Sequence, residues 1–519
     1  MARMRERAAQ WVMMHEHPFT IVEEEGFNLM QKSGMPEWEK ISRTTNKKDC
    51  VSVFEIEKKK LMNVLKNKRV LSFVHIDPPH TGVQIADSVY KCLKEWGIEN
   101  KEFTISVDNA SSNDVEIKTL RENFSVTRRL VCGGKLFHVR CCAHILNLLV
   151  QDGLSKIKDI VKKIHDSVWY IKQSESRVQI FSQIVQQLQL PSRKLILDCK
   201  TRWNSTYEMM VIALQFKNVF PRFKDRDSGF IYSPSDEDWE KVQKVCDILG
   251  VFSTVTNLIS GSDYPTSNIF LNEVFRIKKM LDKKAIDENE FIRVMVKKMK
   301  EKFDKYWGEC NLLMSIAAVL DLRYKMRVIE VSFPRLYPES EARANITKLR
   351  DALYELYKEY VEEFHSSNNE ENVGMSMSTQ MNVGTEAHTY GEFDLEHYLI
   401  EDEDIHSEKS ELDCYLEESR YVCQPGTNTF DALVWWRANI MKHKILSRMT
   451  RDILVIPITT VASEATFNAG GRVIDPYRSS LSPTTVEVLL CGGDWCRNLH
   501  GIKKKSKTEE KLEIDLSIN

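Results

Sequence analysis

The feature that most constrains this chain is an alternation of β-rich runs and helical patterns in its first third. Residues 69–76 (RVLSFVHI) and 103–107 (FTISV) are rich in β-branched and aromatic side chains and end at turn-forming residues, which predicts strands. A shorter run at 137–140 predicts a third strand. Residues 83–96 and 144–154 place apolar side chains at helical spacing. Strands and helices that alternate in this order indicate an α/β architecture.

The region from about residue 155 to 365 has a mainly helical pattern. A capping box at 235–238 precedes an apolar stripe, and two further stripes span 291–306 and 346–364. Long polar helices with one apolar face usually pack against each other. We therefore favour an ordinary helical domain over a helix that carries cofactor ligands.

Composition changes again towards the end of the chain. Residues 365–412 lose periodicity and include an acidic run at 401–408, which predicts a linker or a disordered loop. Apolar residues are densest at 431–441 and 453–490. The basic run at 503–507 could serve as a short nuclear address, although a solvated chain end is the favoured interpretation.

Charge and cysteine content narrow the class of protein. The 519 residues carry 73 Lys and Arg against 75 Asp and Glu, a formal net charge of −2, and 42% of them are hydrophobic. Such values are typical of a soluble globular protein, and a total near zero does not exclude nucleic acid, because binding depends on local patches. We find no signal peptide and no apolar run of membrane-spanning length. We therefore expect an intracellular protein without a membrane partner, whose 12 cysteines are thiols.

Signatures of several enzyme classes are absent from the sequence: the P-loop, the glycine-rich dinucleotide fingerprint, H-E-x-x-H and G-x-S-x-G. Asp108 is the first candidate for chemistry, because it follows the strand predicted at 103–107. The sheets of α/β proteins collect ligands at the carboxyl ends of their strands, so this carboxylate could hold a metal. Asp108 with Asn109 can also be a simple turn, which is the favoured interpretation of the residue taken alone.

Cys141 and His144 place a thiol and an imidazole three residues apart. A structural zinc site generally needs four ligands, and the chain contains no C-x-x-C pair. We therefore expect no structural zinc, and we favour a buried hydrogen-bonded cluster over metal binding.

Two other segments could bind a ligand. Arg202 and Trp203 adjoin in the polar hexapeptide TRWNST, and an aromatic face beside a guanidinium can stack an unpaired base and hold its phosphate. The alternative is an amphipathic Trp at a domain edge. Glu464 follows a strand-like run at 453–459, and Thr460 could cap a helix there. A carboxylate in a first helical turn is favoured by the helix dipole, which is also the simplest explanation of Glu464.

Five sequence blocks occur in an order that resembles the hAT superfamily of DNA transposases, and most closely its domesticated plant members of the RICESLEEPER type. The blocks are VDNASSND (107–114), HVRCCAHILNLLVQDGL (138–154), TRWNSTYEMM (201–210), DLRYKM (321–326) and ILVIPITTVASEATFNAGGRVIDPYRSSLSPTTVEVLL (453–490). The resemblance implies a fold of α/β plus all-α type. In it, a ribonuclease-H-like core is interrupted by a large helical insertion, and a C-terminal dimerisation segment returns to complete the core.

This layout assigns boundaries to the parts of the chain. The predicted parts are an N-terminal helical region (1–66), the first part of the ribonuclease-H-like core (67–220), the helical insertion (221–365), an acidic and polar linker expected to be disordered (366–428), the C-terminal dimerisation region (429–500) and a charged tail (501–519).

The resemblance also implies roles for the candidate residues. Members of the family use two aspartates and one glutamate to hold divalent metals for DNA hydrolysis and strand transfer. Asp108 in VDNASSND is similar to the second aspartate, and Glu464 in VASEATF to the glutamate. Cys141 and His144 match the C-x-x-H signature, and Trp203 is similar to the aromatic that stacks on a flipped base. Three carboxylates suit this chemistry because two Mg²⁺ ions about 3.5–4 Å apart must be held and neutralised, so any remaining activity would need Mg²⁺.

The chain departs from the family pattern at the first aspartate, which normally lies in an Asp-x-Trp-Thr-Ser-like strand. The sequence runs from Leu61 to Arg69 through MNVLKNK, with no acidic residue, so we infer that roughly a strand and a half is missing from the core. Asp77 stands in an Asp-Pro-Pro setting that does not match the catalytic one. Loss of one catalytic carboxylate commonly removes several kcal/mol of transition-state stabilisation, and each loss of about 1.36 kcal/mol lowers the rate tenfold. Because only two of the three carboxylates are present, we predict that cut-and-paste activity is lost.

The apolar C-terminal segment is intact. The resemblance implies that it forms subunit contacts, for which large aromatic anchors are typical. The side chains that we expect to contribute are Leu433, Trp435, Trp436, Ile456 and Phe467. Part of this surface should also pack within its own core, and we expect both roles, with self-association or pairing with other hAT proteins.

Three functions compete. The favoured one is a transposase-derived nuclear protein that dimerises and binds DNA weakly through backbone contacts without cutting it. The second is an interaction protein that pairs with intact family members and inhibits them. The lack of a BED zinc finger favours this second function. Proteins of this type usually begin with that DNA-binding module, and no Cys pair precedes Cys50. Arg202 and Trp203 favour the first function. An active Mg²⁺-dependent transposase ranks last because the first aspartate is missing.

Overall fold

The computed structural model describes residues 1–62, 69–199, 202–261, 264–308, 310–376, 409–422, 430–474 and 481–502. They form two compact units, each built from segments that are distant in the sequence. Unit 1 comprises Met1–Glu102, Ala110–Arg129 and Thr460–Asn519, and unit 2 comprises Phe103–Asn109 and Leu130–Thr459. Each unit has a hydrophobic core of its own.

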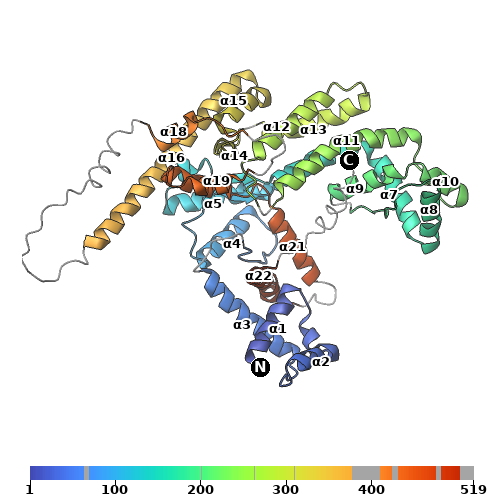
Figure 1. Cartoon of the computed structure of the whole chain (residues 1–519), viewed down its shortest axis with the longest axis horizontal. Helices are drawn as coiled ribbons and strands as arrows, with labels where there is room; N and C mark the ends of the chain where they lie inside the picture. The colour runs from blue at the N-terminus through green and yellow to red at the C-terminus, as the bar shows by residue number, and fades with distance from the viewer. Residues whose placement is uncertain are drawn as a thin grey trace, which may run out of the picture. The chain divides into compact units, whose positions relative to one another are not determined.

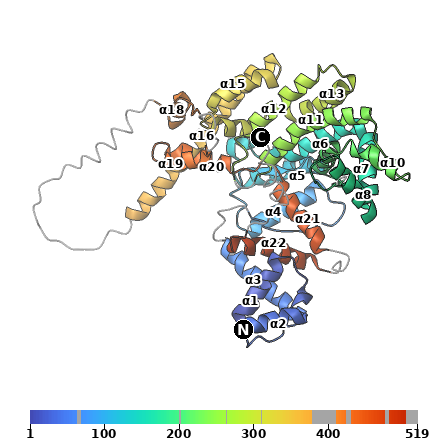
Figure 2. The ribbon, with the colours of Figure 1, turned by 45° about the vertical axis from the view of Figure 1, so that its right-hand side comes forward.

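Unit 1 is helical. Its elements are α1 (Ala2–Met14), the 3-10 helix η1 (Phe19–Glu23), α2 (Glu25–Gly34), α3 (Arg43–Met62), α4 (Gly82–Glu95), α5 (Ser111–Thr127), α21 (Val461–Val473) and α22 (Pro483–Leu499). Helices α1, α3 and α22 pack side by side, although α22 comes from the opposite end of the chain (Figures 1 and 2). Phe54 stacks on Trp495 with ring centroids 4.8 Å apart, and Trp96 meets the same ring edge-on. The helices expected early in the chain are therefore present.

Close contact between α1 and α22 depends on Gly493. A Cβ added at this position would lie 2.5 Å from the carbonyl oxygen of Met13, closer than a Cβ atom can approach without a shift of the backbone. Gly493 therefore lets two helices from opposite ends of the sequence approach backbone to backbone.

The prediction of a strand at 69–76 is wrong. The segment has no regular secondary structure, and side chains of α22 bind its backbone. The carbonyl oxygen of Val70 accepts a hydrogen bond from the Trp495 indole at 2.8 Å, and the amide of Phe73 donates to the Glu487 carboxylate at 3.4 Å. These partners satisfy backbone groups that a neighbouring strand would otherwise have paired, which a local β-rich pattern cannot reveal.

Unit 2 contains the sheet of the described residues. Strands β1 (Ile105–Val107) and β2 (His138–Arg140) pair in parallel, with Ile105 beside His138 and Val107 beside Arg140. Two of the three predicted strands are thus confirmed, with shorter bounds.

The remaining elements of unit 2 are helical. They are η2 (Val131–Gly134), α6 (Cys142–Leu154), η3 (Ser155–Ile157), α7 (Lys158–Lys172), α8 (Glu175–Gln187), α9 (Trp203–Gln215), α10 (Val219–Arg226), α11 (Asp236–Ile259), α12 (Phe270–Lys284), α13 (Glu290–Trp307), α14 (Leu312–Val319), α15 (Lys325–Leu336), α16 (Glu339–Ser376), α18 (Glu411–Glu417), α19 (Ala432–Ala438) and α20 (Lys444–Leu454). The predicted capping box is present at the start of α11, where Ser235 and Asp238 bond each other's backbone amides.

Helix α11 is long and apolar enough to cross a membrane by length and composition alone. Its apolar side chains, including Trp239 and Phe252, are buried in the core of unit 2, where the helix packs against α6, α9 and α12. This is the packing of a core helix in a helical domain.

The C-terminal part of the chain returns to the sheet within unit 2. The Ser106 hydroxyl donates to the carbonyl oxygen of Pro457 at 2.8 Å, and the Cys142 amide donates to that of Ile458 at 2.9 Å. This agrees with the expected return of the chain to its core. The run at 453–459 is nevertheless not a strand, because α20 continues to Leu454 and irregular structure follows.

Most of the linker predicted at 366–428 lies outside the described residues, as does the basic run at 503–507. Where the linker is described, it is partly helical, which corrects the expectation of disorder for that part. Helix α16 extends to Ser376, and α18 begins at a capping box formed by Ser410 and Asp413. Tyr415 is buried and holds α18 on the core. The prediction failed because it used only the local polarity of the sequence, which carries no information about such long-range contacts.

Candidate functional site

Asp108 lies directly after β1, at the carboxyl edge of the sheet, as predicted. The carbonyl oxygen of Val107 accepts a hydrogen bond from the Cys141 amide at 2.8 Å, and the Asn109 side chain reaches the carbonyl oxygen of Cys141 at 3.5 Å. Asp108 itself is half-buried. The edge therefore gathers one carboxylate and the start of α6, which is the place where sheets of this kind bind ligands.

Glu464 lies in the first turn of α21, as predicted. It is exposed, and the hydroxyl of Thr460 donates to its carboxylate at 2.9 Å. Asp108 belongs to unit 2 and Glu464 to unit 1, so a metal site that both residues share stays a prediction.

Cys141 caps α6. Its buried thiol accepts a hydrogen bond from the amide of His144 at 3.4 Å, which satisfies one of the free amides at the helix start. His144 is half-buried. The thiol of Cys141 and the backbone amide of His144 thus interact through a helix cap.

One other group of residues in the described part of the chain could hold a metal, and sequence reasoning missed it. The thiol of Cys132 and the carboxylates of Glu355 and Glu359 lie within 4.8 Å of one another. Both oxygens of Glu359 lie 3.1 Å from the amide of Cys132, and Lys135 forms an ion pair with Glu355 at 2.6 Å. These contacts already explain the group as the attachment of η2 to α16.

Arg202 is exposed immediately before α9, whereas Trp203 is only 4% exposed and belongs to the core of unit 2. A base could stack on Trp203 only after this side chain left its packed position. Sequence reasoning also missed a polar contact between α7 and α9. Asp198 lies 2.6 Å from the His165 ring and 2.9 Å from the Thr206 hydroxyl, so its carboxylate joins these two helices.

The five residues expected at a subunit contact divide into three groups. Trp436 and Ile456 are buried within unit 2, whereas Leu433 and Trp435 are half-buried. Phe467, on α21 of unit 1, is 71% exposed. The segment thus contributes to its own core and also leaves apolar surface exposed, and the subunit contact expected of these residues stays a prediction.

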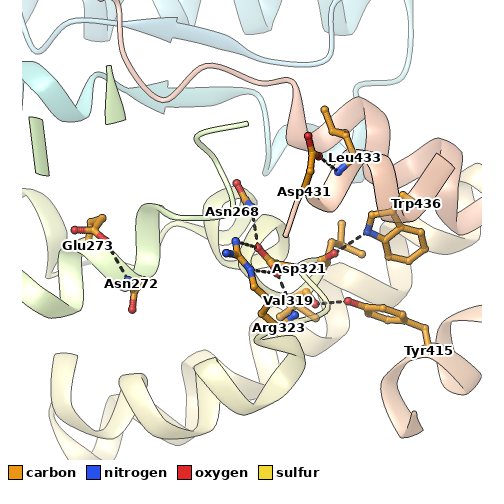
Figure 3. Close-up of polar contacts among 11 residues, drawn as sticks. Asn268, Asn272, Glu273, Val319, Asp321, Arg323, Tyr415, Asp431, Leu433 and Trp436 are labelled. Atoms are coloured by element: carbon orange, nitrogen blue, oxygen red, sulfur yellow. Dashed lines mark hydrogen bonds and ion pairs between the residues drawn. The ribbon is translucent and has the colours of Figure 1, made fainter. Parts of the chain in front are cut away.

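The block DLRYKM forms a polar junction for which the sequence suggested no role (Figure 3). Asp321 is fully buried, and its carboxylate binds the Arg323 guanidinium at 2.6 Å and the Asn268 amide at 2.8 Å. Two aromatic side chains of the C-terminal region reach the same loop. The Tyr415 hydroxyl donates to the carbonyl oxygen of Val319 at 2.9 Å, and the Trp436 indole donates to that of Leu320 at 2.9 Å.

Lys325, in the same block, caps the last turn of α18. Its ammonium group donates to the carbonyl oxygens of Tyr415 and Glu418 and lies 4.4 Å from the Tyr415 ring centroid. Burial lowers the pKa of Lys325 to about 8, so this side chain is still mainly charged at pH 7. A cation is stabilising at a helix C-terminus, so Lys325 at the start of α15 stabilises the end of α18 and ties the two helices together.

Comparison with known families identifies the parts of the chain. Residues 50–136 match the ZBED1 RNase-like domain and 139–248 the ZBED1 RNase-like helical domain. Residues 268–360 match the hAT-like transposase, RNase-H fold, and 411–496 the hAT family C-terminal dimerisation region. Together with the small parallel sheet and its returning C-terminal segment, these matches show that the chain belongs to the hAT transposase family.

Within this family the chain is similar to domesticated plant proteins and to transposases. It is 34% identical to the zinc finger BED domain-containing protein RICESLEEPER 2 of Oryza sativa subsp. japonica, over 95% of this chain and 74% of that protein. It is 31% identical to DAYSLEEPER of Arabidopsis thaliana, over 95% and 73% of the two chains, respectively. A putative AC transposase of Zea mays is 33% identical, over 93% of this chain and 64% of that protein.

Proposed function

We propose that this chain is a nuclear, transposase-derived protein that dimerises through its C-terminal region and binds DNA without cutting it. Its relationship to the RICESLEEPER proteins and the match of residues 411–496 to a dimerisation region support this proposal. A fluorescent fusion of the full chain should accumulate in the nucleus.

The proposed loss of DNA cleavage is inferred from the segment between Leu61 and Arg69. Its sequence contains no acidic residue, and residues 63–68 lie outside the described part of the chain. The following residues, 69–76, bind side chains of α22 instead of forming a strand. Two-metal hydrolysis needs carboxylates that hold both ions, and Asp108 and Glu464 supply two of the three. These residues are the ones that would hold Mg²⁺ if any activity remained.

DNA binding is supported by the exposed side chain of Arg202. This residue directly precedes α9. An exposed guanidinium suits a phosphate, and a contact of that kind carries no sequence information. We therefore expect binding that depends on the DNA backbone.

The alternative function is pairing alone, with inhibition of intact hAT proteins. The burial of Trp203 favours it, because a packed indole is not available to stack on a base. Exposed apolar residues support self-association in either case: Phe467 is 71% exposed in unit 1, and Met441 is 81% exposed in unit 2.

A salt titration of binding to duplex DNA tests the first proposal. Phosphate contacts release counterions, so the logarithm of the binding constant should fall linearly with that of the salt concentration. The variant Arg202→Gln should weaken binding and reduce the slope by about one. Arg335→Gln, on the exposed side of α15, is the matched control and should change neither value. Binding that is absent, or that salt does not affect, would leave pairing alone as the function.

A cleavage assay tests the proposed loss of activity. The full chain should not nick a supercoiled plasmid that carries candidate transposon ends, with either Mg²⁺ or Mn²⁺. The variant Glu464→Gln supplies the background rate. Metal-dependent nicking by the natural sequence that disappears in Glu464→Gln would show that two carboxylates suffice, and the proposal would be wrong.

A further inference from the structure

Trp169, on α7 of unit 2, is the one exposed tryptophan of the chain. The structure describes all 10 tryptophans, and Trp169 is 45% exposed, whereas the others are buried or half-buried. Tryptophan is enriched where proteins bind other molecules, because its ring offers a large, rigid apolar face. An indole that stays in water on an ordered helix therefore marks a candidate binding surface.

Lysines surround this indole on the solvent side of α7. The exposed residues of the helix are Lys158, Asp159, Lys162, Trp169 and Lys172. At about 100° per residue, the three lysines and the indole fall within about 80° of one another around the helix axis, a surface that we call the Trp169 face. Helix α7 packs against α8 and α9 (Figure 1).

Positive charge dominates the Trp169 face. Asp159 and the half-buried Asp166 stand at one edge of it, about 60° or more from the indole around the helix axis. Within the described residues, the salt bridges of α7 are formed by Lys163 and His165, and not by the three lysines of the face. The charges of these lysines therefore stay available to an anionic partner.

A neighbouring loop adds a fourth lysine. The ammonium group of Lys172 donates to the carbonyl oxygen of Leu195 at 3.4 Å, so this loop lies beside the last turn of α7. Lys194, next in sequence to Leu195, is exposed. The loop thus extends the positive surface beyond the end of the helix.

The Trp169 face is also linked to the start of α9. His165 and Thr206 both contact the carboxylate of Asp198, at 2.6 and 2.9 Å. His165 precedes Trp169 by one helical turn, and Thr206 follows Arg202 by a little more than one turn. The guanidinium proposed to bind phosphate therefore belongs to the same region of unit 2 as the exposed indole.

The chemistry of the face distinguishes a nucleic acid from a protein partner. A protein interface has an apolar centre made by several side chains, whereas Trp169 is the one apolar residue exposed on α7. Every base offers a flat π-face that stacks on an aromatic ring, and lysines beside the ring can neutralise the phosphates of the same strand. A base within a duplex is already stacked on its neighbours, so the face suits a strand whose bases are unpaired.

We propose that the Trp169 face binds single-stranded or unpaired nucleotides of DNA, with a base stacked on the indole and the phosphates of the strand at the neighbouring lysines. The inference rests on the proposed DNA binding and adds to it the part of the DNA that is bound. It places stacking on an exposed indole, whereas Trp203 is buried in the core.

Binding of a short oligothymidylate and of an abasic strand of the same length to the full chain tests the proposal. The two strands carry the same phosphates, so a difference in affinity reports contacts with bases. We expect the natural chain to bind the oligothymidylate about tenfold more tightly or better. Trp169→Ala should remove this preference, because only the phosphate contacts remain, and Trp169→Phe should keep part of it.

Two further variants separate stacking from charge. Lys162→Gln should weaken the binding of both strands alike and reduce the salt dependence by about 0.7 in slope. Ile286→Ala is the matched control, because Ile286 is an 82% exposed apolar residue of unit 2 that lies between α12 and α13. It should bind both strands as the natural chain does. Melting curves establish that each variant is folded.

The outcomes separate this inference from the proposed function. If the chain binds duplex DNA but Trp169→Ala binds both strands as the natural chain does, the Trp169 face is not the site and the proposed function stands. If a base preference that depends on Trp169 is found without duplex binding, the proposed backbone binding fails and the face stands. If no DNA binds, both fail. A changed oligomeric state of Trp169→Ala with unchanged DNA binding would assign the face to a second copy of the chain and overturn the inference.

Discussion

His443 lies among three aromatic side chains in the region that matches the hAT dimerisation family. It is 1% exposed, with ring centroids of Tyr415, Trp435 and Trp436 at 6.3, 6.4 and 5.8 Å. Neither ring nitrogen makes a hydrogen bond within the described residues, and Nε2 lies 3.9 Å from a Glu418 oxygen. Burial lowers the pKa of His443 from its ordinary 6.5, so the folded protein holds this residue neutral.

This burial predicts a loss of stability in acid. Because the unfolded chain takes up a proton at His443 at a higher pH than the folded one, its contribution to the free energy of unfolding decreases as pH falls below about 6.5. His443→Leu cannot titrate, so its stability relative to the natural chain should rise between pH 7 and pH 5. Urea denaturation at several pH values measures the difference. A difference that does not change with pH would mean that the pKa of His443 is the same in the folded and the unfolded chain.

At the scale of elements, the close packing of α1 against α22 depends on Gly493. Gly493→Ala places a methyl group against the carbonyl oxygen of Met13, so the helices must separate, and we expect unit 1 to lose about 1–3 kcal/mol. Gly471→Ala is the matched control, because nothing lies within 4 Å of the added methyl group. That change should stabilise α21 by up to about 1 kcal/mol, through helix propensity alone. Thermal unfolding that ranks the two variants in the opposite order would contradict this packing.

Elements with local signals could be predicted from the sequence. The capping box of Ser235 and Asp238 and the strand before Asp108 are visible within a few residues, and both are present. The run at 69–76 has an equally clear β pattern, yet it is not a strand, because Glu487 and Trp495 bind its backbone from more than 400 residues away. A local pattern reports what the backbone prefers and carries no information about a distant side chain that binds it.

The same limit applies to the candidate sites. The placement of Asp108 at a sheet edge follows from strand and turn patterns alone. The burial of Trp203 and the junction around Asp321 do not, because both depend on packing between helices.

At the scale of the whole molecule, unit 1 needs its C-terminal helices. A chain that ends at Thr459 lacks α21 and α22, so Phe54 in α3 loses its stacking on Trp495 and α1 loses its packing against α22. We expect hydrogen exchange to show unprotected amides in α1 and α3, whereas α6 and α11 in unit 2 stay protected. A chain that ends at Ile502 is the control and should protect all four helices. Protection of α1 in the shorter chain would mean that its fold does not require α22.

The contact of α1 and α3 with α22 also has a consequence for how the protein is made. A ribosome that has finished α3 at Met62 must still add more than 400 residues before α22 begins at Pro483. At about 5–20 residues per second, that interval lasts roughly 20–80 s, during which the apolar faces of α1 and α3 lack their partner. Unit 2 has all of its residues by Thr459 and can fold first, so the end of the chain that is synthesised first belongs to the unit that is completed last.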